Sequence, residues 1–436
     1  MSGAKMTATR SSAAIGLMQE PGSVHAVVVG SGEVGLRTAL SLVESGVAVT
    51  GVDLDGSRLL VRNAEPSTPE HARVEHALAH GRMELTSDVA AISDAEFVVI
   101  AVPMPVDSRL VPDMRELTAA CASVVACAAE GQSIVLTSTT YVGCTRDLVA
   151  EPLRHRNGWT IGEDVHVAFS PEHVDPGVNG RERYATPRVI GGVTEECGRR
   201  AEAVIARGAP AVHAVTSPEV AEMTELLENS FRAVNMAMIN EFADGCRAFG
   251  VDPIEVIEAA ATKPHGFVPF RPGPGVGGHG IPCDTHSLLW QLRAQRFPAP
   301  LMNAAMGSIA ARPHRVVERA RHLLADRGKR FAGSDVLVLG VAHEPGVADV
   351  RESPALEVMA VLAAEGVRVA YADPFVPAIR LGDTTVRADD APESRWWDLV
   401  IVHTAHPGAE MSWLSGQNAV LDTTYRLDPS LRCAHL

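Results

Sequence analysis

The feature that most constrains the fold is a glycine-rich turn placed between two apolar runs. The run Val24–Val29 is almost wholly apolar, as expected for a buried strand of a parallel sheet. The turn that follows reads Gly30-Ser-Gly32-Glu-Val-Gly35, and it leads into a predicted helix. A second apolar run then ends at Asp53. This order of strand, glycine turn, helix, strand and acidic residue predicts the first unit of a dinucleotide-binding Rossmann domain.

Each glycine of the turn has a physical reason in a dinucleotide site. Gly30 permits the tight turn, Gly32 lets the backbone approach a pyrophosphate, and Gly35 allows the helix to pack closely on the strand. The helix beginning at Val34 then directs its free N–H groups toward the anion. A structural glycine turn in a domain that has lost its cofactor is the alternative.

The acidic residue after the second strand indicates which dinucleotide is bound. Asp53 lies 18 residues after Gly35, where its carboxylate can accept hydrogen bonds from ribose hydroxyls. A carboxylate there would repel the 2′-phosphate of NADP, so the sequence favours NAD. Arg58 nearby keeps NADP open as an alternative.

Composition excludes several other classes of protein. The 436 residues carry 38 Lys+Arg against 53 Asp+Glu, a net charge of −15, which argues against nucleic-acid binding. No stretch is long and apolar enough for a membrane helix, and no secretory signal is evident, so we expect a cytoplasmic protein. The seven cysteines lack metal-ligand spacing, and we therefore expect neither a metal site nor disulfides.

The pattern of apolar runs divides the chain into segments. Strand-like and helix-like stretches alternate after residue 24 and again after Asp335, whereas Glu219–Phe249 reads as one long helix. The predicted fold class is α/β, with two Rossmann-like doubly wound domains joined by a long central helix. The predicted segments are a disordered tail (1–23), an NAD-binding domain (24–213), a central helical dimerisation segment with a glycine-rich active-site loop (214–330) and a nucleotide-sugar-binding α/β domain (331–436).

The most informative segment is a loop rich in Gly and Pro between Thr262 and Asp284, whose backbone N–H groups can meet the oxygens of a ligand. A plain linker is the alternative, but linkers are rarely so apolar while lacking Ser. With this loop, the sequence resembles the UDP-glucose/GDP-mannose 6-dehydrogenase family, most closely its UDP-N-acetylhexosamine branch, from about Val24 to Leu427. The matching blocks are Gly30–Gly35 with Asp53, Val102–Pro105, Ser138–Tyr141, Phe169–Glu172, Ala221–Arg232, the loop through His279, and Asp349–Ala355.

The resemblance implies a nucleotide-sugar substrate linked to UDP or GDP, and a homodimer formed through the central helix. By position, Thr140 and Glu172 match groups that hold the reacting water and the nicotinamide, Asn229 matches an oxyanion-binding Asn, and Asp284 matches an acid/base Asp. Further cofactor contacts are implied for Val102, Pro103, Thr140 and Arg351. Nucleotide contacts are implied for Phe267, Phe270, Arg271, Val276 and Gly277. Packing at a domain junction is the alternative for the two phenylalanines, and capping of the following helix is the alternative for Arg351.

The sequence departs from the family at the groups that carry its second oxidation. Family members oxidise a primary alcohol twice, and a cysteine after Gly-Gly-His attacks the intermediate aldehyde, but that position is Gly280. A family lysine that supports charge on the reacting oxygen is replaced by Glu225, and a second family lysine by Glu344. Cys283 stands three residues beyond the missing thiol, where we expect a buried structural residue.

The chemistry predicted from these departures is a single two-electron oxidation. Without a nucleophile there is no covalent route to a second oxidation, whereas one hydride transfer needs only NAD, positioning and a base. A secondary alcohol oxidised once gives a keto-sugar nucleotide, as in specialised sugar or antibiotic biosynthesis such as the lincosamide amino-octose pathway. We expect Glu225 to be the base, with Asp284, His279 and His286 as rivals. A catalytically dead regulatory paralogue, or a four-electron 6-dehydrogenase acting through Cys283, are the alternative functions.

Overall fold

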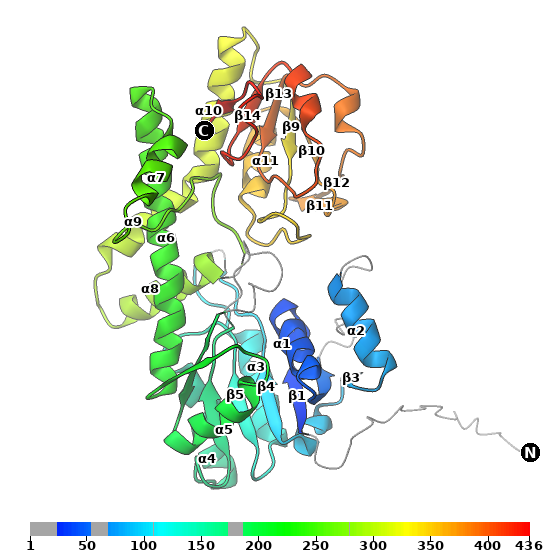
Figure 1. Cartoon of the computed structure of the whole chain (residues 1–436), viewed down its shortest axis with the longest axis vertical. Coiled ribbons are helices and arrows are strands. Elements are labelled where there is room, and N and C mark those ends of the chain that lie inside the picture. The colour runs from blue at the N-terminus through cyan, green and yellow to red at the C-terminus, as the bar shows by residue number, and fades with distance from the viewer. Residues whose placement is uncertain (1–23, 54–68, 108, 173–185, 279) are drawn as a thin grey trace, which may run out of the picture.

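The computed structural model describes residues 24–53, 69–107, 109–172, 186–278 and 280–436 (Figure 1), so the predicted tail at 1–23 lies outside the described residues. The first sheet has eight strands in the order β3-β2-β1-β4-β5-β6-β7-β8, and neighbours are parallel except for β6 and β7. Register is fixed by pairs such as Val27 with Thr50 on one side and with Val98 on the other. The strands are β1 (His25–Val29), β2 (Ala48–Val52), β3 (Met83–Thr86), β4 (Phe97–Ile100), β5 (Ser133–Leu136), β6 (His166–Phe169), β7 (Arg188–Gly192) and β8 (Val212–Val215).

Helices cover both faces of this sheet, as a doubly wound fold requires. Because side chains alternate along a strand, Val27 and Val29 pack in one core while Ala26 and Val28 pack in the other. The first core is closed by α3 (Arg115–Cys127), the π-helical turn η4 (Arg146–Ala150) and α4 (Glu151–Asn157). The second is closed by α1 (Glu33–Glu44), α2 (Pro69–Ala79) and α5 (Glu195–Ile205).

A 32-residue helix, α6 (Pro218–Phe249), runs alongside both α/β units in Figure 1, close to the predicted bounds Glu219–Phe249. The Ser217 side chain accepts a hydrogen bond from the backbone N–H of Val220, and Gly250 ends the helix in the left-handed conformation. The helices that follow are α7 (Pro253–Ala261), α8 (Gly280–Ala294), α9 (Pro300–Ala310) and α10 (Arg312–Asp326), of which α8 and α9 pack on α6.

The second sheet is fully parallel and has the order β10-β9-β13-β14-β15, so the α/β class with two Rossmann-like units is confirmed. Its strands are β9 (Asp335–Leu339), β10 (Arg368–Ala372), β13 (Leu399–Val402), β14 (Val420–Asp422) and β15 (Ala434–His435). Helix α11 (Pro354–Ala364) and α10 pack on it, and a hairpin of β11 (Ala378–Leu381) and β12 (Thr384–Arg387) lies beside it. No helix among the described residues combines the length and apolarity needed to cross a membrane.

Candidate active site

The glycine turn after β1 has the stereochemistry of a pyrophosphate-binding loop. Gly30 adopts a φ of +107°, and a Cβ there would lie 2.3 Å from the carbonyl oxygen of Ala101. A Cβ on Gly35 would lie 2.1 Å from the Gly30 carbonyl oxygen, so both positions require glycine. In contrast, a Cβ on Gly32 would meet no atom within 4 Å, and this residue precedes the first turn of α1. The turn therefore leaves open space at a helix N-terminus, where an anion can approach the backbone.

Asp53 lies beside this turn, as predicted. Its carboxylate, at the carboxyl end of β2, accepts hydrogen bonds from the backbone N–H of Ser31 at 3.0 Å and from the Ser31 hydroxyl. Val34 is 36% exposed on the first turn of α1. Just past the end of β4, which pairs with β1 on the side opposite β2, the backbone N–H of Val102 donates to the Ser138 hydroxyl at 2.9 Å. The next residue, Pro103, is exposed, and Arg58 lies outside the described residues.

These observations predict that a methyl group lowers the stability of the fold at one glycine and weakens NAD binding at another. Gly35→Ala should destabilise the fold by about 2–3 kcal/mol, because the methyl overlaps backbone atoms that cannot move freely. Gly32→Ala should leave the unfolding temperature unchanged and weaken NAD binding about 100-fold, because its methyl enters the space that the pyrophosphate needs. Thermal unfolding and calorimetric titration with NAD separate the two effects. Equal NAD affinity for Gly32→Ala and the native protein would contradict this placement of the cofactor.

Two helices and one strand end bring four polar side chains together. On α6, Glu225 and Asn229 lie one turn apart and therefore share a face. The Asn229 amide donates to the carboxylate of Asp284 on α8. The hydroxyl of Thr139, just after β5, donates to the Glu225 carboxylate at 3.4 Å. Three of the predicted catalytic residues are thus assembled at the junction of α6, α8 and the loop after β5.

Both carboxyl groups are buried, at 8% exposure for Glu225 and 0% for Asp284. Burial raises the pKa of Glu225 to about 8, and the hydrogen bond from Thr139 opposes that rise. Burial also raises the pKa of Asp284 well above its usual range, and the nearby Glu225 charge raises it further, against the hydrogen bonds from Asn229 and Thr139. Two neighbouring buried carboxyl groups that raise each other's pKa favour a state in which at least one of them is protonated near neutral pH.

The position of the family's thiol lies directly against this cluster. A Cβ on Gly280 would lie 3.5 Å from the Asn229 amide oxygen, which is ordinary van der Waals contact. Helix α8 begins at Gly280, so Asp284 stands on a helix and not on the predicted loop. A spacing of four residues places Gly280 and Asp284 on one face of α8, since 3.6 residues complete a turn.

Cys283 does not share the environment expected of a nucleophile. Its side chain is 1% exposed, and burial raises the pKa of its thiol to about 12. A thiol with so high a pKa carries almost no thiolate at neutral pH. Of the rival bases, His286 follows Asp284 by two residues, which places it on the opposite side of α8, and burial lowers its pKa. His279 lies outside the described residues.

The remaining predicted catalytic residues flank the cluster without joining it through a direct hydrogen bond that the structure describes. Thr140 is 1% exposed and follows Thr139. Glu172, after β6, accepts hydrogen bonds from the guanidinium of Arg188 on β7 and from the Thr38 hydroxyl on α1 at 3.3 Å. Arg188 also lowers the pKa of Glu225 by its charge, so the arginine that is paired with Glu172 acts electrostatically on the cluster.

The glycine-rich loop packs against the C-terminal unit. The backbone N–H of Gly278 donates to the carbonyl of Arg351 at 3.0 Å, and a Cβ on Gly277 would lie 2.8 Å from the carbonyl oxygen of Glu352. The Arg351 guanidinium is held on Asp349 through hydrogen bonds of 2.8–2.9 Å from its Nε. Gly277, a predicted nucleotide contact, and Arg351, a predicted cofactor contact, therefore lie at the same junction between the loop and the C-terminal unit.

The other predicted nucleotide contacts are spread along the loop. Phe267 is half-buried, and Phe270 meets the ring of Phe231 edge-on with centroids 6.0 Å apart. Val276 packs in the small core between α6, α8 and α9. Arg271, predicted to meet a phosphate, is paired with Glu258 of α7 at 3.2 Å on the surface. Its predicted role would require that exposed ion pair to open, which costs little.

The three family domains are recognisable along the chain. Residues 24–207 match the NAD-binding domain of the UDP-glucose/GDP-mannose dehydrogenase family, residues 219–308 its central domain and residues 337–429 its UDP-binding domain. The chain belongs to the UDP-glucose/GDP-mannose dehydrogenase family. It is an NAD-dependent nucleotide-sugar dehydrogenase, an oxidoreductase.

Individual dehydrogenases of the family are similar over most of their length. The UDP-N-acetyl-D-mannosamine dehydrogenase of Salmonella typhimurium is 33% identical over 343 residues, which are 76% of this chain and 80% of that protein. The NDP-N-acetyl-D-galactosaminuronic acid dehydrogenase of Ralstonia solanacearum is 32% identical over 344 residues, or 76% and 78% of the two chains. The UDP-D-ManNAc dehydrogenase structure from Pyrococcus horikoshii superposes with a TM-score of 0.82 at 27% identity, covering 94% of this chain and 99% of that one.

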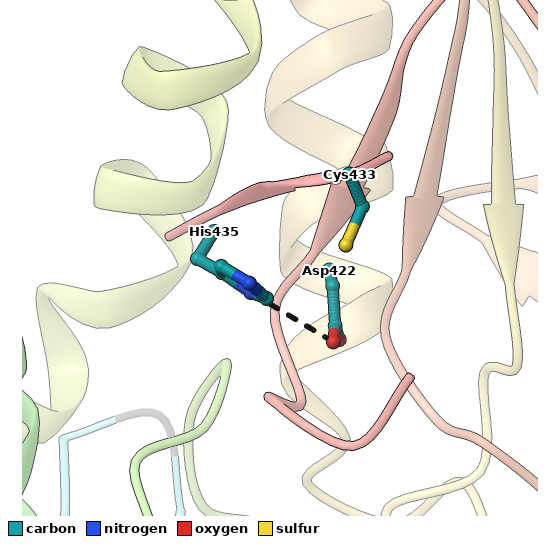
Figure 2. Close-up of side chains that lie close together, drawn as sticks. All are labelled: Asp422, Cys433 and His435. Carbon is teal, nitrogen blue, oxygen red and sulfur yellow. Dashed lines mark ion pairs between the residues drawn. The ribbon is translucent and has the colours of Figure 1, made fainter. Parts of the chain in front are cut away.

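One group of potential metal ligands occurs in the described part of this dehydrogenase, where the sequence predicts none. Asp422, Cys433 and His435 come close together at the edge of the second sheet (Figure 2). However, the Asp422 carboxylate already accepts five hydrogen bonds from residues 424–427, and His435 stacks on Tyr425. The hydrogen bonds occupy the acceptor positions of both carboxylate oxygens and fix residues 424–427, so little capacity remains to coordinate a metal ion.

Sequence reasoning missed two side chains of the dehydrogenase site. The resemblance points to Thr140, whereas the structure places the hydroxyl of its neighbour Thr139 on Glu225, and both residues lie in the matched block Ser138–Tyr141. Arg188, which is paired with Glu172 and whose charge lowers the pKa of Glu225, comes from β7, a strand that the apolar pattern does not predict. Four consecutive Ser or Thr residues after a buried strand (137–140) are the available signal for Thr139, but only the backbone path decides which one faces Glu225.

Proposed function

We propose that this dehydrogenase oxidises a nucleotide-activated sugar once, converting a secondary alcohol into a keto-sugar nucleotide. The proposal rests on one observation. Gly280, at the position of the family's cysteine, lies against the Asn229 amide, where a side chain would fit but the residue has no thiol. A ketone has no C–H bond left to transfer, so a site without a covalent nucleophile suits this oxidation. The pathway would be one of specialised sugar or antibiotic biosynthesis, such as the lincosamide amino-octose pathway.

In this proposal the protein moves the proton and orients the reacting carbon. The turn at Gly30–Gly35 with Asp53 would hold NAD, which supplies the hydride acceptor when bound. The Glu225 carboxylate takes the hydroxyl proton as the carbinol C–H bond breaks and the carbonyl forms. Asn229 donates a hydrogen bond to Asp284 and thereby fixes the second carboxyl group beside the first. A raised pKa suits Glu225 to accept a proton near the working pH.

The experiment that tests the proposal counts electrons. The enzyme is incubated with excess NAD and a limiting amount of a UDP- or GDP-linked sugar, and NADH released per sugar is measured. We expect one NADH and a product that forms an oxime with O-methylhydroxylamine, detected by mass spectrometry. Two NADH and a uronic acid would overturn the proposal, and no NADH with any sugar nucleotide would favour the catalytically dead paralogue.

We also propose that two copies of the chain pair through α6. Large apolar side chains recur on its surface at spacings of three, four or seven residues, a pattern typical of helix pairing. Isolated exposed apolar residues are common, but a stripe of this length along one helix indicates a partner. The residues are Val220, Met223, Leu227, Phe231, Met238 and Phe242, each more than 40% exposed.

Charges placed in this stripe should separate the dimer. Met238→Glu combined with Phe242→Glu should give a monomer, because both side chains are about half-exposed in the single chain and lie away from Glu225. Light scattering after gel filtration measures the mass. Trp396→Glu, at a residue that is 71% exposed on the C-terminal unit, is the matched control and should remain dimeric. A native protein that is monomeric at micromolar concentration would contradict the pairing.

A further inference from the structure

The loop between β5 and η4 carries Thr139, and a side-chain amide holds its backbone. The Oε1 atom of Gln291 accepts a hydrogen bond from the Val142 N–H at 3.1 Å. The Nε2 atom of the same amide donates to the Val142 carbonyl oxygen at 2.7 Å. Both backbone groups of one residue are thus paired with a single side chain that lies 149 residues away in sequence. Such a two-point contact fixes orientation as well as distance.

Gln291 joins this loop to the helix that carries Asp284. The two residues are seven positions apart on α8, and they therefore share a face. Helix α6 also holds this loop. The buried carboxylate of its Glu222 accepts hydrogen bonds from the Gly143 N–H, at 2.6 Å, and from Thr145. The loop is therefore held from two sides by the two helices that contribute the paired carboxyl groups.

We propose that Gln291 is a positioning residue that, by holding the loop at Val142, keeps the Thr139 hydroxyl on the Glu225 carboxylate. The inference rests on the proposed function in so far as Glu225 is taken as the base. The Thr139 hydrogen bond is 3.4 Å long, so a small displacement of the loop would break it. Gln291 itself does not touch the substrate or the cofactor in this proposal.

Loss of that hydrogen bond has a defined electrostatic consequence. The Thr139 hydroxyl stabilises the ionised form of Glu225, and its loss therefore raises the pKa of that carboxyl group. The other groups that act on Glu225 belong to three elements, and in the described part of the chain none of them is hydrogen-bonded to the Gln291 side chain. They are Glu222 and Glu228 of α6, Arg188 of β7 and Asp284 of α8.

The test titrates Glu225 directly in the full-length protein labelled with carboxyl-¹³C glutamate, and the Glu225→Gln variant assigns its NMR signal. Gln291→Met keeps the length of the side chain and removes the amide. We expect the midpoint of the Glu225 titration to move up by about one pH unit, as loss of a hydrogen bond to a charged group predicts. Gln295→Met, at an exposed residue one turn further on, should leave the midpoint unchanged.

A double-mutant cycle tells positioning from an indirect effect of packing. Thr139→Val should produce the same upward shift, and the combination with Gln291→Met should shift the midpoint no further. Additive shifts, or no shift in a folded Gln291→Met protein, would overturn the proposal. If Gln291→Met fails to fold, Gln291→Asn replaces it, because its amide is one methylene too short to reach Val142. The same upward shift of the Glu225 midpoint is expected, and its absence in the folded variant would overturn the proposal.

The titration requires no turnover. An inactive but folded protein would refute the proposed function and would still report whether Gln291 controls Glu225.

Discussion

Replacing Glu225 by glutamine should lower kcat for the oxidation by about 100- to 10,000-fold, the usual contribution of a general base. Glutamine has the same shape and can still accept the hydrogen bond from Thr139, so the fold and NAD affinity should be retained. Glu228→Gln is the control for loss of a carboxylate on the same helix: Glu228 is exposed, and because its charge raises the pKa of Glu225, its loss should lower that pKa and leave the base in place. Stopped-flow measurement of NADH formation, with calorimetric titration of NAD, separates loss of chemistry from loss of binding.

The pH dependence gives this prediction a second, independent readout. A base acts in its ionised form, and burial raises the pKa of Glu225 to about 8. Oxidation should therefore be slow at pH 6, rise as the pH passes through about 8, and level off above that value. The rise should be missing in Glu225→Gln. A Glu225→Gln enzyme that keeps the native rate and the native pH limb would show that another group, such as Asp284, removes the proton.

Much of the fold follows from local pattern. Continuous apolar runs such as Val24–Val29 and residues 335–339 can be satisfied only by strands buried on both faces, and Gly30 and Gly35 fix where the first strand turns into α1. The antiparallel strand β7 was not predicted, because its short run Arg188–Gly192 mixes a charge with glycines and carries no clear period.

Within the catalytic cluster, local pattern alone predicts which residues lie together only where one element carries two of them. The spacing of Glu225 and Asn229 on a helix fixes that they share a face, whatever the tertiary structure. The bond from Gln291 to Val142 and the bond from Thr139 to Glu225 join residues 149 and 86 positions apart, so no local rule could supply them. The predicted end of the glycine-rich loop is also wrong by five residues, since residues 280–284, where proline and cysteine indicate irregular structure, form the start of α8.

Restoring the two family side chains should change the number of electrons removed. With a UDP-N-acetylhexosamine bearing a primary alcohol, any turnover by the native chain should stop after one NADH, at the aldehyde. Gly280→Cys combined with Glu225→Lys should release two NADH and form a carboxylate, with Asp284, the position of the family's acid/base Asp, taking the proton in place of Glu225. The cysteine fits because a Cβ at 280 makes ordinary contact with Asn229, and a thiol at the N-terminus of α8 has a lowered pKa.

The lysine at 225 has its own electrostatic reason. It would replace one of two buried carboxyl groups by a cation beside Asp284, which removes the repulsion that raises the pKa of Asp284 and favours charge on a reacting oxygen. Mass spectrometry of the product, together with the NADH count, measures the outcome. Adding Cys283→Ala to the double variant should change nothing, because that thiol is buried. If the native chain already releases two NADH, and Cys283→Ala abolishes the second, the nucleophile is Cys283 and the lack of a side chain at Gly280 does not determine the chemistry.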